Sequence, residues 1–185
     1  MVLKAAAPDL VHKTDVGGVA LGLRDAAAVW AAFDAMHARL GEAMGGAIVQ
    51  ATALPGVETL VGVTHDPSFG PLVVFGMGGV EAELMHDTAL SIVPLTDVDA
   101  RELIRTPRTS ARMFGYRGAR EVDVAALEEL LLRVAALADA VPEVAELDLN
   151  PVVVSEQGVS VVDVKLRLAP VAPGPPPGIR RMRDR

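Results

Sequence analysis

Residues 55–83 read PGVETLVGVTHDPSFGPLVVFGMGGVEAE, and this stretch decides the fold. Its two runs rich in branched aliphatic residues, 58–65 and 71–77, flank the segment DPSFGP, whose Pro and Gly favour a tight loop. The pattern predicts a hairpin of two antiparallel strands. A second pair of runs, 145–154 and 159–168, is joined in the same way by the segment SEQG. With AIVQA at 47–51 as a further strand, the sequence predicts a largely antiparallel sheet.

Helical patterns lie outside these hairpins. Residues 25–40 carry apolar side chains at a spacing of three to four, and Asp25 can cap the first turn. Residues 123–141 repeat the pattern behind Asp123, and a shorter helix is predicted after Thr96, where TDVDAREL has the form of a capping box. Helices outside hairpins predict the α+β class.

Composition excludes several kinds of protein. A net charge of −7 argues against a protein whose main task is to bind nucleic-acid phosphates. The chain has no cysteine, so disulfides, thiolate nucleophiles and Cys-ligated metal sites are excluded. No apolar run reaches the roughly 18 to 20 residues of a membrane helix, and the first residues lack a signal-peptide layout. We therefore expect a soluble, cytoplasmic protein.

Two glycine-rich segments are candidates for anion binding. In HKTDVGGV (12–19), Gly17 and Gly18 would let backbone amides wrap an anion, although the segment could equally form a turn with solvated charges. In GMGGVEAE (76–83), Gly78 and Gly79 emerge at the end of a predicted strand, where ligands commonly bind. The alternative there is a glycine-rich bend that serves packing.

The segment ELDLNP (146–151) is a candidate metal site. In an extended strand, the side chains of Asp148 and Asn150 point to the same face. Oxygen ligands spaced in this way suit Mg²⁺, and Asp163 on the paired strand can complete the set. The alternative, a solvated sheet face, has about equal weight from the residues alone.

Together HKTDVGGV, the block 55–83 and ELDLNP resemble the ATP-grasp domain of the ADP-forming acyl-CoA synthetases, the family of acetate–CoA ligase (ADP-forming). More distant relatives are the succinyl-CoA synthetase β subunit and certain protein acetyltransferases. The resemblance runs from about residue 2 to residue 168 and implies an ATP-grasp fold that is incomplete in its N-terminal subdomain. It divides the chain into a remnant of the first subdomain (1–47), a nucleotide- and Mg-binding subdomain (48–169) and a Pro/Arg-rich tail (170–185).

The resemblance also implies roles for individual residues. His12 matches a histidine that becomes phosphorylated and relays phosphate to the nucleotide. Magnesium would be bound at Asp148, Asn150 and Asp163. Contacts to ATP or ADP are implied for Lys4, Gly17, Gly18, Gln50, Glu58, Gly78 and Gly79. Gln50 departs from the family pattern, because many ATP-grasp proteins have a Glu at that position.

The function implied by the resemblance is one part of an acid–thiol ligase. A carboxylic acid, CoA and ATP would be interconverted with acyl-CoA, ADP and phosphate through a phosphohistidine. The carboxylate and CoA would be bound by a CoA-binding (α-like) partner subunit or domain, and neither nucleic acid nor a membrane is an expected partner. An oligomer is expected if the incomplete subdomain leaves apolar surface for a partner to cover. The alternatives are a non-catalytic or regulatory ATP-grasp module of a protein acetyltransferase and a truncated, inactive fragment.

Overall fold

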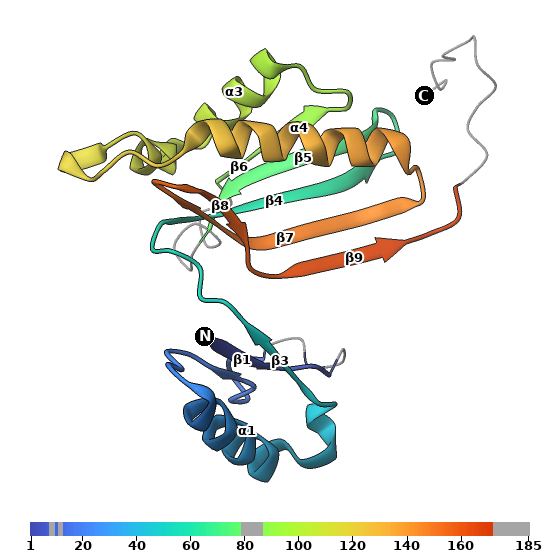
Figure 1. Cartoon of the computed structure of the whole chain (residues 1–185). Coiled ribbons are helices and arrows are strands. Elements are labelled where there is room, and N and C mark those ends of the chain that lie inside the picture. Colours follow the sequence, from blue (N-terminus) through green and yellow to red (C-terminus); the bar gives the residue numbers. More distant parts are fainter. Residues whose placement is uncertain (8–9, 11–12, 79–86, 172–185) are drawn as a thin grey trace. The chain divides into compact units, whose positions relative to one another are not determined.

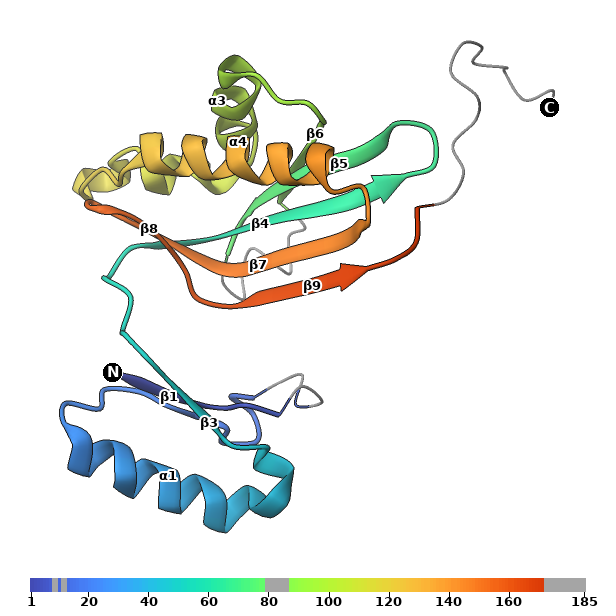
Figure 2. The same cartoon turned by 45° about the vertical axis from the view of Figure 1, so that its right-hand side comes forward.

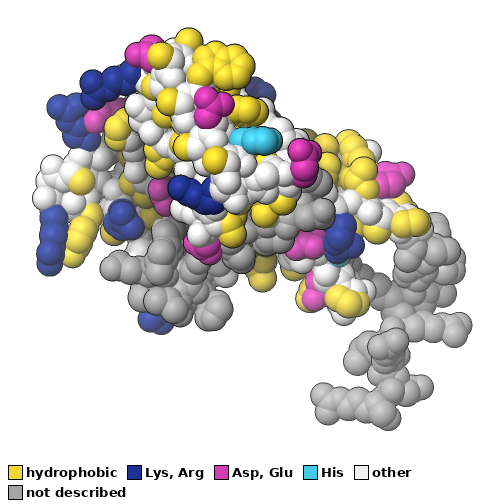
Figure 3. Space-filling model, turned by 90° about the horizontal axis from the view of Figure 1, so that it is seen from below, with side chains coloured by type: hydrophobic (Ala, Val, Ile, Leu, Met, Phe, Trp, Pro, Cys, Tyr) yellow, Lys and Arg dark blue, Asp and Glu magenta, His cyan; other side chains and the backbone are white. Residues whose placement is uncertain are grey.

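The computed structural model describes residues 1–7, 10, 13–78 and 87–171. Two compact units, Met1–Ala53 and Leu54–Arg185, make up the chain and are described separately (Figure 1). No helix among the described residues is long and apolar enough to cross a bilayer, and the face drawn in Figure 3 mixes hydrophobic with charged side chains.

Unit 1 (Met1–Ala53) is a three-stranded antiparallel sheet with one long helix. The strands lie in the sheet in the order β2 (Val19–Ala20), β1 (Val2–Ala5) and β3 (Ala47–Gln50). Along the chain, α1 (Ala26–Leu40) and the 3₁₀ helix η1 (Gly41–Met44) connect β2 to β3. The predicted cap is confirmed, because the Asp25 carboxylate accepts a hydrogen bond of 2.8 Å from the Ala28 amide. Leu3 and Ala5 of β1 pack against Met36 of α1 and form a small core.

Unit 2 (Leu54–Arg185) contains a six-stranded antiparallel sheet in the order β6-β5-β4-β7-β8, with β9 also paired to β7. Its strands are β4 (Val57–Asp66), β5 (Gly70–Met77), β6 (Thr88–Ile92), β7 (Val144–Ser155), β8 (Gly158–Val161) and β9 (Val164–Leu168). The long strand β7 pairs with β4 along one edge and with both β8 and β9 along the other. Both predicted hairpins, β4–β5 and β7–β8, are confirmed.

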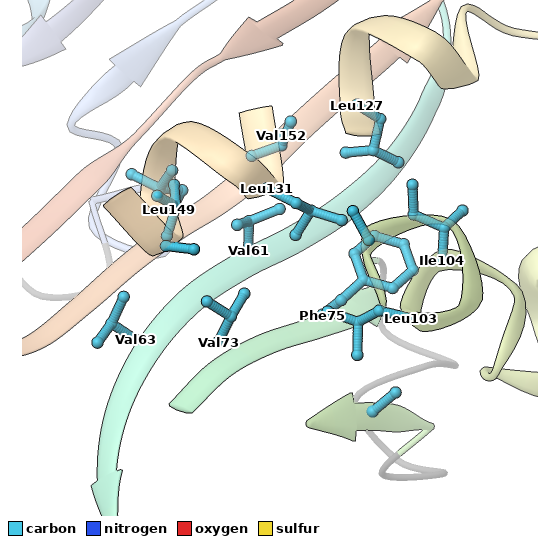
Figure 4. Close-up of a cluster of buried hydrophobic side chains, with 14 of the residues drawn as sticks. Val61, Val63, Val73, Phe75, Leu103, Ile104, Leu127, Leu131, Leu149 and Val152 are labelled. Carbon is cyan, nitrogen blue, oxygen red and sulfur yellow. The ribbon is translucent and has the colours of Figure 1, made fainter. Parts of the chain in front are cut away.

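Two α-helices of unit 2, α3 (Asp97–Arg105) and α4 (Val124–Ala140), cover one face of this sheet (Figures 1 and 2). Both were predicted, and Thr96 forms the predicted capping box with Asp99. Alternate residues of the strands point toward the helices, so that Val61 and Phe75, which are register partners, meet Leu131 in the core (Figure 4). The sheet face that the helices do not cover carries residues such as Leu90, which is 58% exposed. The α+β class is therefore confirmed.

The prediction of one continuous strand over 159–168 is wrong, because the chain breaks between β8 and β9. Opposite the break, the register of β7 against β4 shifts next to Pro151. Pro151 has no amide hydrogen for the ladder, and its carbonyl accepts a bond of 3.0 Å from the Val162 amide. The two halves of β7 are therefore bordered by two short strands, and Asp163 lies in the connection between them. Strand β6 was not predicted.

Asp87 ties the start of β6 to the 3₁₀ helix η2 (Arg108–Met113). Its carboxylate accepts bonds of 2.9 Å from the amides of Arg108 and Thr109, and a third bond from the Thr109 hydroxyl. These bonds, that of the hydroxyl above all, hold the pKa of Asp87 below its usual value. Asp87 therefore contributes stability above the pKa of the unfolded state, and loses it as pH falls through the lower folded-state pKa.

Replacing Asp87 with alanine is expected to lower the free energy of unfolding by about 1 kcal/mol at pH 7, because three donors lose their acceptor. The difference from wild type should shrink as pH falls from the pKa of the unfolded state through the lower pKa of the folded state. Urea denaturation at several pH values measures it. Asp139→Ala, at an exposed position of α4, is the control, and an Asp87→Ala deficit that persists undiminished at pH 2 contradicts the assignment.

Candidate functional site

In unit 1, strands β1 and β3 place Lys4 and Gln50 on the same sheet face. Lys4 is the register partner of Ile48, and Gln50 that of Val2, so the two polar side chains lie two positions apart along the ladder. The alternate residue Leu3 is buried with α1. Lys4 and Gln50 are both partly buried, so the structure brings these two predicted nucleotide contacts together on the sheet face opposite α1.

The predicted glycine loop of unit 1 is a turn over residues 13–17 that leads into β2. Gly17 has φ of 71°, a backbone conformation that favours glycine at this turn. The amides of Gly17 and Gly18 donate to the carbonyls of Thr14 and Lys13, at 3.1 and 2.6 Å. To bind an anion, these amides would have to give up their hydrogen bonds to the two carbonyls. Anion binding by Gly17 and Gly18 stays a prediction. His12 lies outside the described residues.

In unit 2, Glu58 and Gly78 meet where β4 begins and the antiparallel β5 ends. The Gly78 amide donates a bond of 2.8 Å to the Glu58 carbonyl. A Cβ on Gly78 would lie 2.9 Å from the Glu58 carbonyl carbon, so the close approach of the two backbones requires glycine. Glu58 itself is exposed, next to the buried Thr59, and is free to reach a ligand on the uncovered sheet face. Gly79 lies outside the described residues.

The three predicted metal ligands lie along β7 and the β8–β9 connection. The Asn150 amide donates a bond of 3.3 Å to the Asp163 carbonyl, which brings these two residues side by side. Asp148 lies two residues earlier on β7, and its register partner is Lys165 of β9. The structure therefore places Asn150 next to Asp163, whereas Asp148 faces a cation.

Lys165 and Arg167 were not predicted from the sequence, but they lie beside the predicted metal-site residue Asp148. Together with Glu146, Asp148 and Leu166 they line a hollow of about 310 Å³ on β7 and β9. Arg167 forms an ion pair of 3.2 Å with Glu146, its register partner. The alternation of Lys165 and Arg167 in VKLRL matches the period of Asp148 and Asn150, and this signal could have revealed the cations.

The oxygen donors beside the break suit a magnesium ion that is shared with a ligand. Among residues 1–7, 10, 13–78 and 87–171, no three Asp, Glu or His side chains form a metal-binding group. Mg²⁺ is usually held by only one or two carboxylates, with substrate phosphates and water completing its octahedron. Asp163 has an exposed side chain, and its backbone carbonyl accepts a bond from the backbone amide of Asn150. Such a neighbouring pair fits that mode better than a closed protein cage.

Comparison with known proteins covers nearly all of the chain. The family model described as an ATP-grasp domain matches residues 1–168. Acetate–CoA ligase [ADP-forming] I of Archaeoglobus fulgidus is 41% identical over 172 residues, which are 91% of this chain and 25% of that protein. The chain thus spans about a quarter of that relative. The β subunit of acetate–CoA ligase [ADP-forming] I of Pyrococcus furiosus is 32% identical, with 91% and 75% covered.

A solved structure is similar to this chain over the same length as the relatives above. Dinucleotide-forming acetyl-coenzyme A synthetase 1 of Ca. Korarchaeum cryptofilum, in complex with coenzyme A and Mg-AMPPCP, is 37% identical with a TM-score of 0.82. The alignment covers 91% of this chain and 76% of the other. In that structure a phosphohistidine segment points towards the nucleotide-binding site.

Proposed function

The chain belongs to the ATP-grasp family, and from this membership we propose that it is the nucleotide-binding, β-subunit-like part of an ADP-forming acyl-CoA synthetase. The observation that carries the proposal is that the likeness extends over 91% of this chain and 75% of a curated ligase β subunit. ATP or ADP with Mg²⁺ is the proposed cofactor pair, in keeping with the Mg-AMPPCP bound by the related synthetase.

The proposed reaction of the complete system converts acyl-CoA, ADP and phosphate into a carboxylic acid, CoA and ATP, and the reverse. The step assigned to this chain transfers a phosphoryl group between His12 and the nucleotide. A β-phosphate oxygen of ADP attacks the phosphorus, the phosphorus–nitrogen bond breaks, and the imidazole recovers the electron pair. The carboxylic acid and CoA would be bound by an α-like subunit or domain, the proposed partner.

Positioning and charge neutralisation are the proposed work of the remaining residues. Lys4 supplies a positive charge for the phosphates, and Asn150 and Asp163 hold the metal. When bound, Mg²⁺ would neutralise part of the negative charge of the phosphates. Asp148, whose register partner is Lys165, is the third proposed metal-site residue. Glu58 contacts the nucleoside. The division of the chain into a nucleotide-binding part and an N-terminal remnant is part of the same proposal.

The proposal predicts that Asp163→Ala weakens Mg-ADP binding about 10- to 100-fold, because the exposed carboxylate beside Asn150 is lost. Isothermal titration of the purified chain with ADP and Mg²⁺ measures the change. Asp139→Ala removes an equally charged, exposed side chain on α4 and should bind as wild type does. Equal affinities for Asp163→Ala and wild type contradict the metal assignment. Absence of saturable binding by wild type contradicts the nucleotide site, while family membership stands.

A second candidate function, a regulatory nucleotide-binding module of a protein acetyltransferase, is favoured by one residue. Gln50 offers a neutral amide on β3 where many ATP-grasp proteins carry a carboxylate. A neutral residue there removes an acceptor charge for ribose or adenine, as expected where transfer chemistry has been lost. Phosphoryl transfer through His12 distinguishes the two candidates.

A further inference from the structure

Residues 101–120 concentrate positive charge in an otherwise acidic chain. They include one acidic residue, Glu102, and six arginines, a local charge of +5 against −7 for the whole protein. The arginines are Arg101, Arg105, Arg108, Arg112, Arg117 and Arg120. They lie on α3, on η2, on the 3₁₀ helix η3 (Tyr116–Gly118) and just beyond it. No residue proposed for the Mg-nucleotide site belongs to this segment.

Only part of this charge is neutralised. Arg101 and Arg105 approach the same carboxylate, that of Glu128, at 3.7 and 3.8 Å. Arg120 pairs with Glu156 at 3.2 Å. The guanidinium groups of Arg108, Arg112 and Arg117 make no ion pair with any residue that the structure describes. The nearby Asp87 carboxylate is directed at the backbone amides of Arg108 and Thr109.

One hollow in this segment combines the arginines with aromatic rings. It has a volume of about 440 Å³, and Arg105, Arg108, Thr106, Ser110, Phe114 and Tyr116 contribute to its lining. The Arg105 guanidinium lies 5.0 Å from the centre of the Phe114 ring and donates a bond of 2.8 Å to the Arg101 carbonyl. These contacts fix Arg105 in place. Tyr116 is 54% exposed, and the Arg117 guanidinium lies over its ring at 5.4 Å from the ring centre. A ligand ring would use the part of the tyrosine that Arg117 leaves open.

The backbone that presents Tyr116 is strained. Arg117 has φ of 56°, and it is the one non-glycine residue with positive φ among the described residues. Residues with a Cβ rarely adopt this conformation, because the Cβ comes too close to the following carbonyl oxygen. Gly115 and Gly118 flank the turn with φ of 75° and 81°. Strain of this kind persists where the surrounding structure imposes it, and it is concentrated at binding and switch sites.

We propose that this hollow binds a phosphate ester that carries a flat ring. The phosphate would be held by Arg108, which forms no ion pair with any residue that the structure describes. Arg105, which shares the Glu128 carboxylate with Arg101, would add a second charge. The ring would stack on Tyr116, and 440 Å³ is enough for a ligand of that size. The site is separate from the proposed metal ligands and goes beyond the proposed function.

The test is a titration of the full chain with phenyl phosphate in the presence of EDTA, which removes divalent cations from the proposed nucleotide site. Binding is followed by NMR at the backbone amides of Thr106, Ser110, Gly115 and Gly118. We expect saturable shifts at these amides, and at least about tenfold weaker binding of inorganic phosphate, which has no ring, and of benzyl alcohol, which has no charge.

Matched variants locate the site. Arg108→Ser and Tyr116→Ala should each weaken phenyl phosphate binding about tenfold or more, whereas Arg112→Ser should leave it unchanged. Arg112 lies on the same helix η2 and is exposed, but it does not line the hollow. Unshifted amides overturn the proposal. So does equal binding of inorganic phosphate, or an equal loss in Arg112→Ser, because either result indicates attraction by diffuse charge alone.

Discussion

Phe75→Ala is expected to lower the free energy of unfolding of unit 2 by about 3–5 kcal/mol. The Phe75 side chain is fully buried at the centre of the sheet, where it packs between the strands and both helices (Figure 4). Truncation removes a large apolar group and leaves a cavity whose walls, α3 and α4, are held by their own contacts with the sheet. A loss of this size is a large fraction of the roughly 5–15 kcal/mol by which domains are stable.

Urea denaturation followed by far-UV circular dichroism measures this loss. Phe69→Ala is the matched control, because Phe69 is 56% exposed in the turn between β4 and β5. Its replacement should change stability by no more than about 0.5 kcal/mol. Equal midpoints for Phe75→Ala and Phe69→Ala contradict the packing described for the sheet and its helices.

The largest effect on activity is expected for His12→Asn, which should form no ATP from a phosphorylated chain and ADP. An asparagine amide is not a nucleophile and cannot carry the phosphoryl group that imidazole can. The chain is first treated with phosphoramidate, a reagent that phosphorylates histidine, and the excess is removed. Mg-ADP is then added, and the ATP formed is measured with luciferase.

His37→Asn is the control for unspecific histidine phosphorylation. His37 is exposed on α1 and stacks on Phe33, with 6.1 Å between the ring centres. The control should form as much ATP as wild type. ATP formation by His12→Asn at the wild-type level contradicts the relay role. Absence of ATP from wild type itself, together with Mg-ADP binding in the titration, favours the regulatory function.

Local sequence signals predicted most of the helices and hairpins. The starts of α1 behind its cap Asp25 and of α3 behind its cap Thr96 were predictable, because each cap needs only residues within three positions. The break between β8 and β9 could not be predicted in this way. The break depends on the carbonyl of Pro151, which accepts a hydrogen bond from the Val162 amide. These two residues are eleven positions apart along the chain, beyond the reach of a local pattern.

The candidate site was predictable only in part. The alternation of Asp148 and Asn150 on one strand follows from the period of an extended chain. The register that sets Lys165 opposite Asp148 is fixed by pairing across the β7–β9 ladder, which no local pattern encodes. The roles of Lys4, Glu58 and His12 came from resemblance to a family, because single residues of these types carry no signal in a short window.

The pairing of β4 with β7 also has a consequence for how unit 2 folds while it is being synthesised. The register joins Val57 to Val154, so residues 58–153, about three quarters of unit 2, lie between the two partners. A ribosome releases the β4–β5 hairpin long before it releases β7, and until then one edge of β4 has unsatisfied amides and carbonyls. The nascent chain therefore passes through an interval in which strand addition by another chain competes with completion of its own sheet.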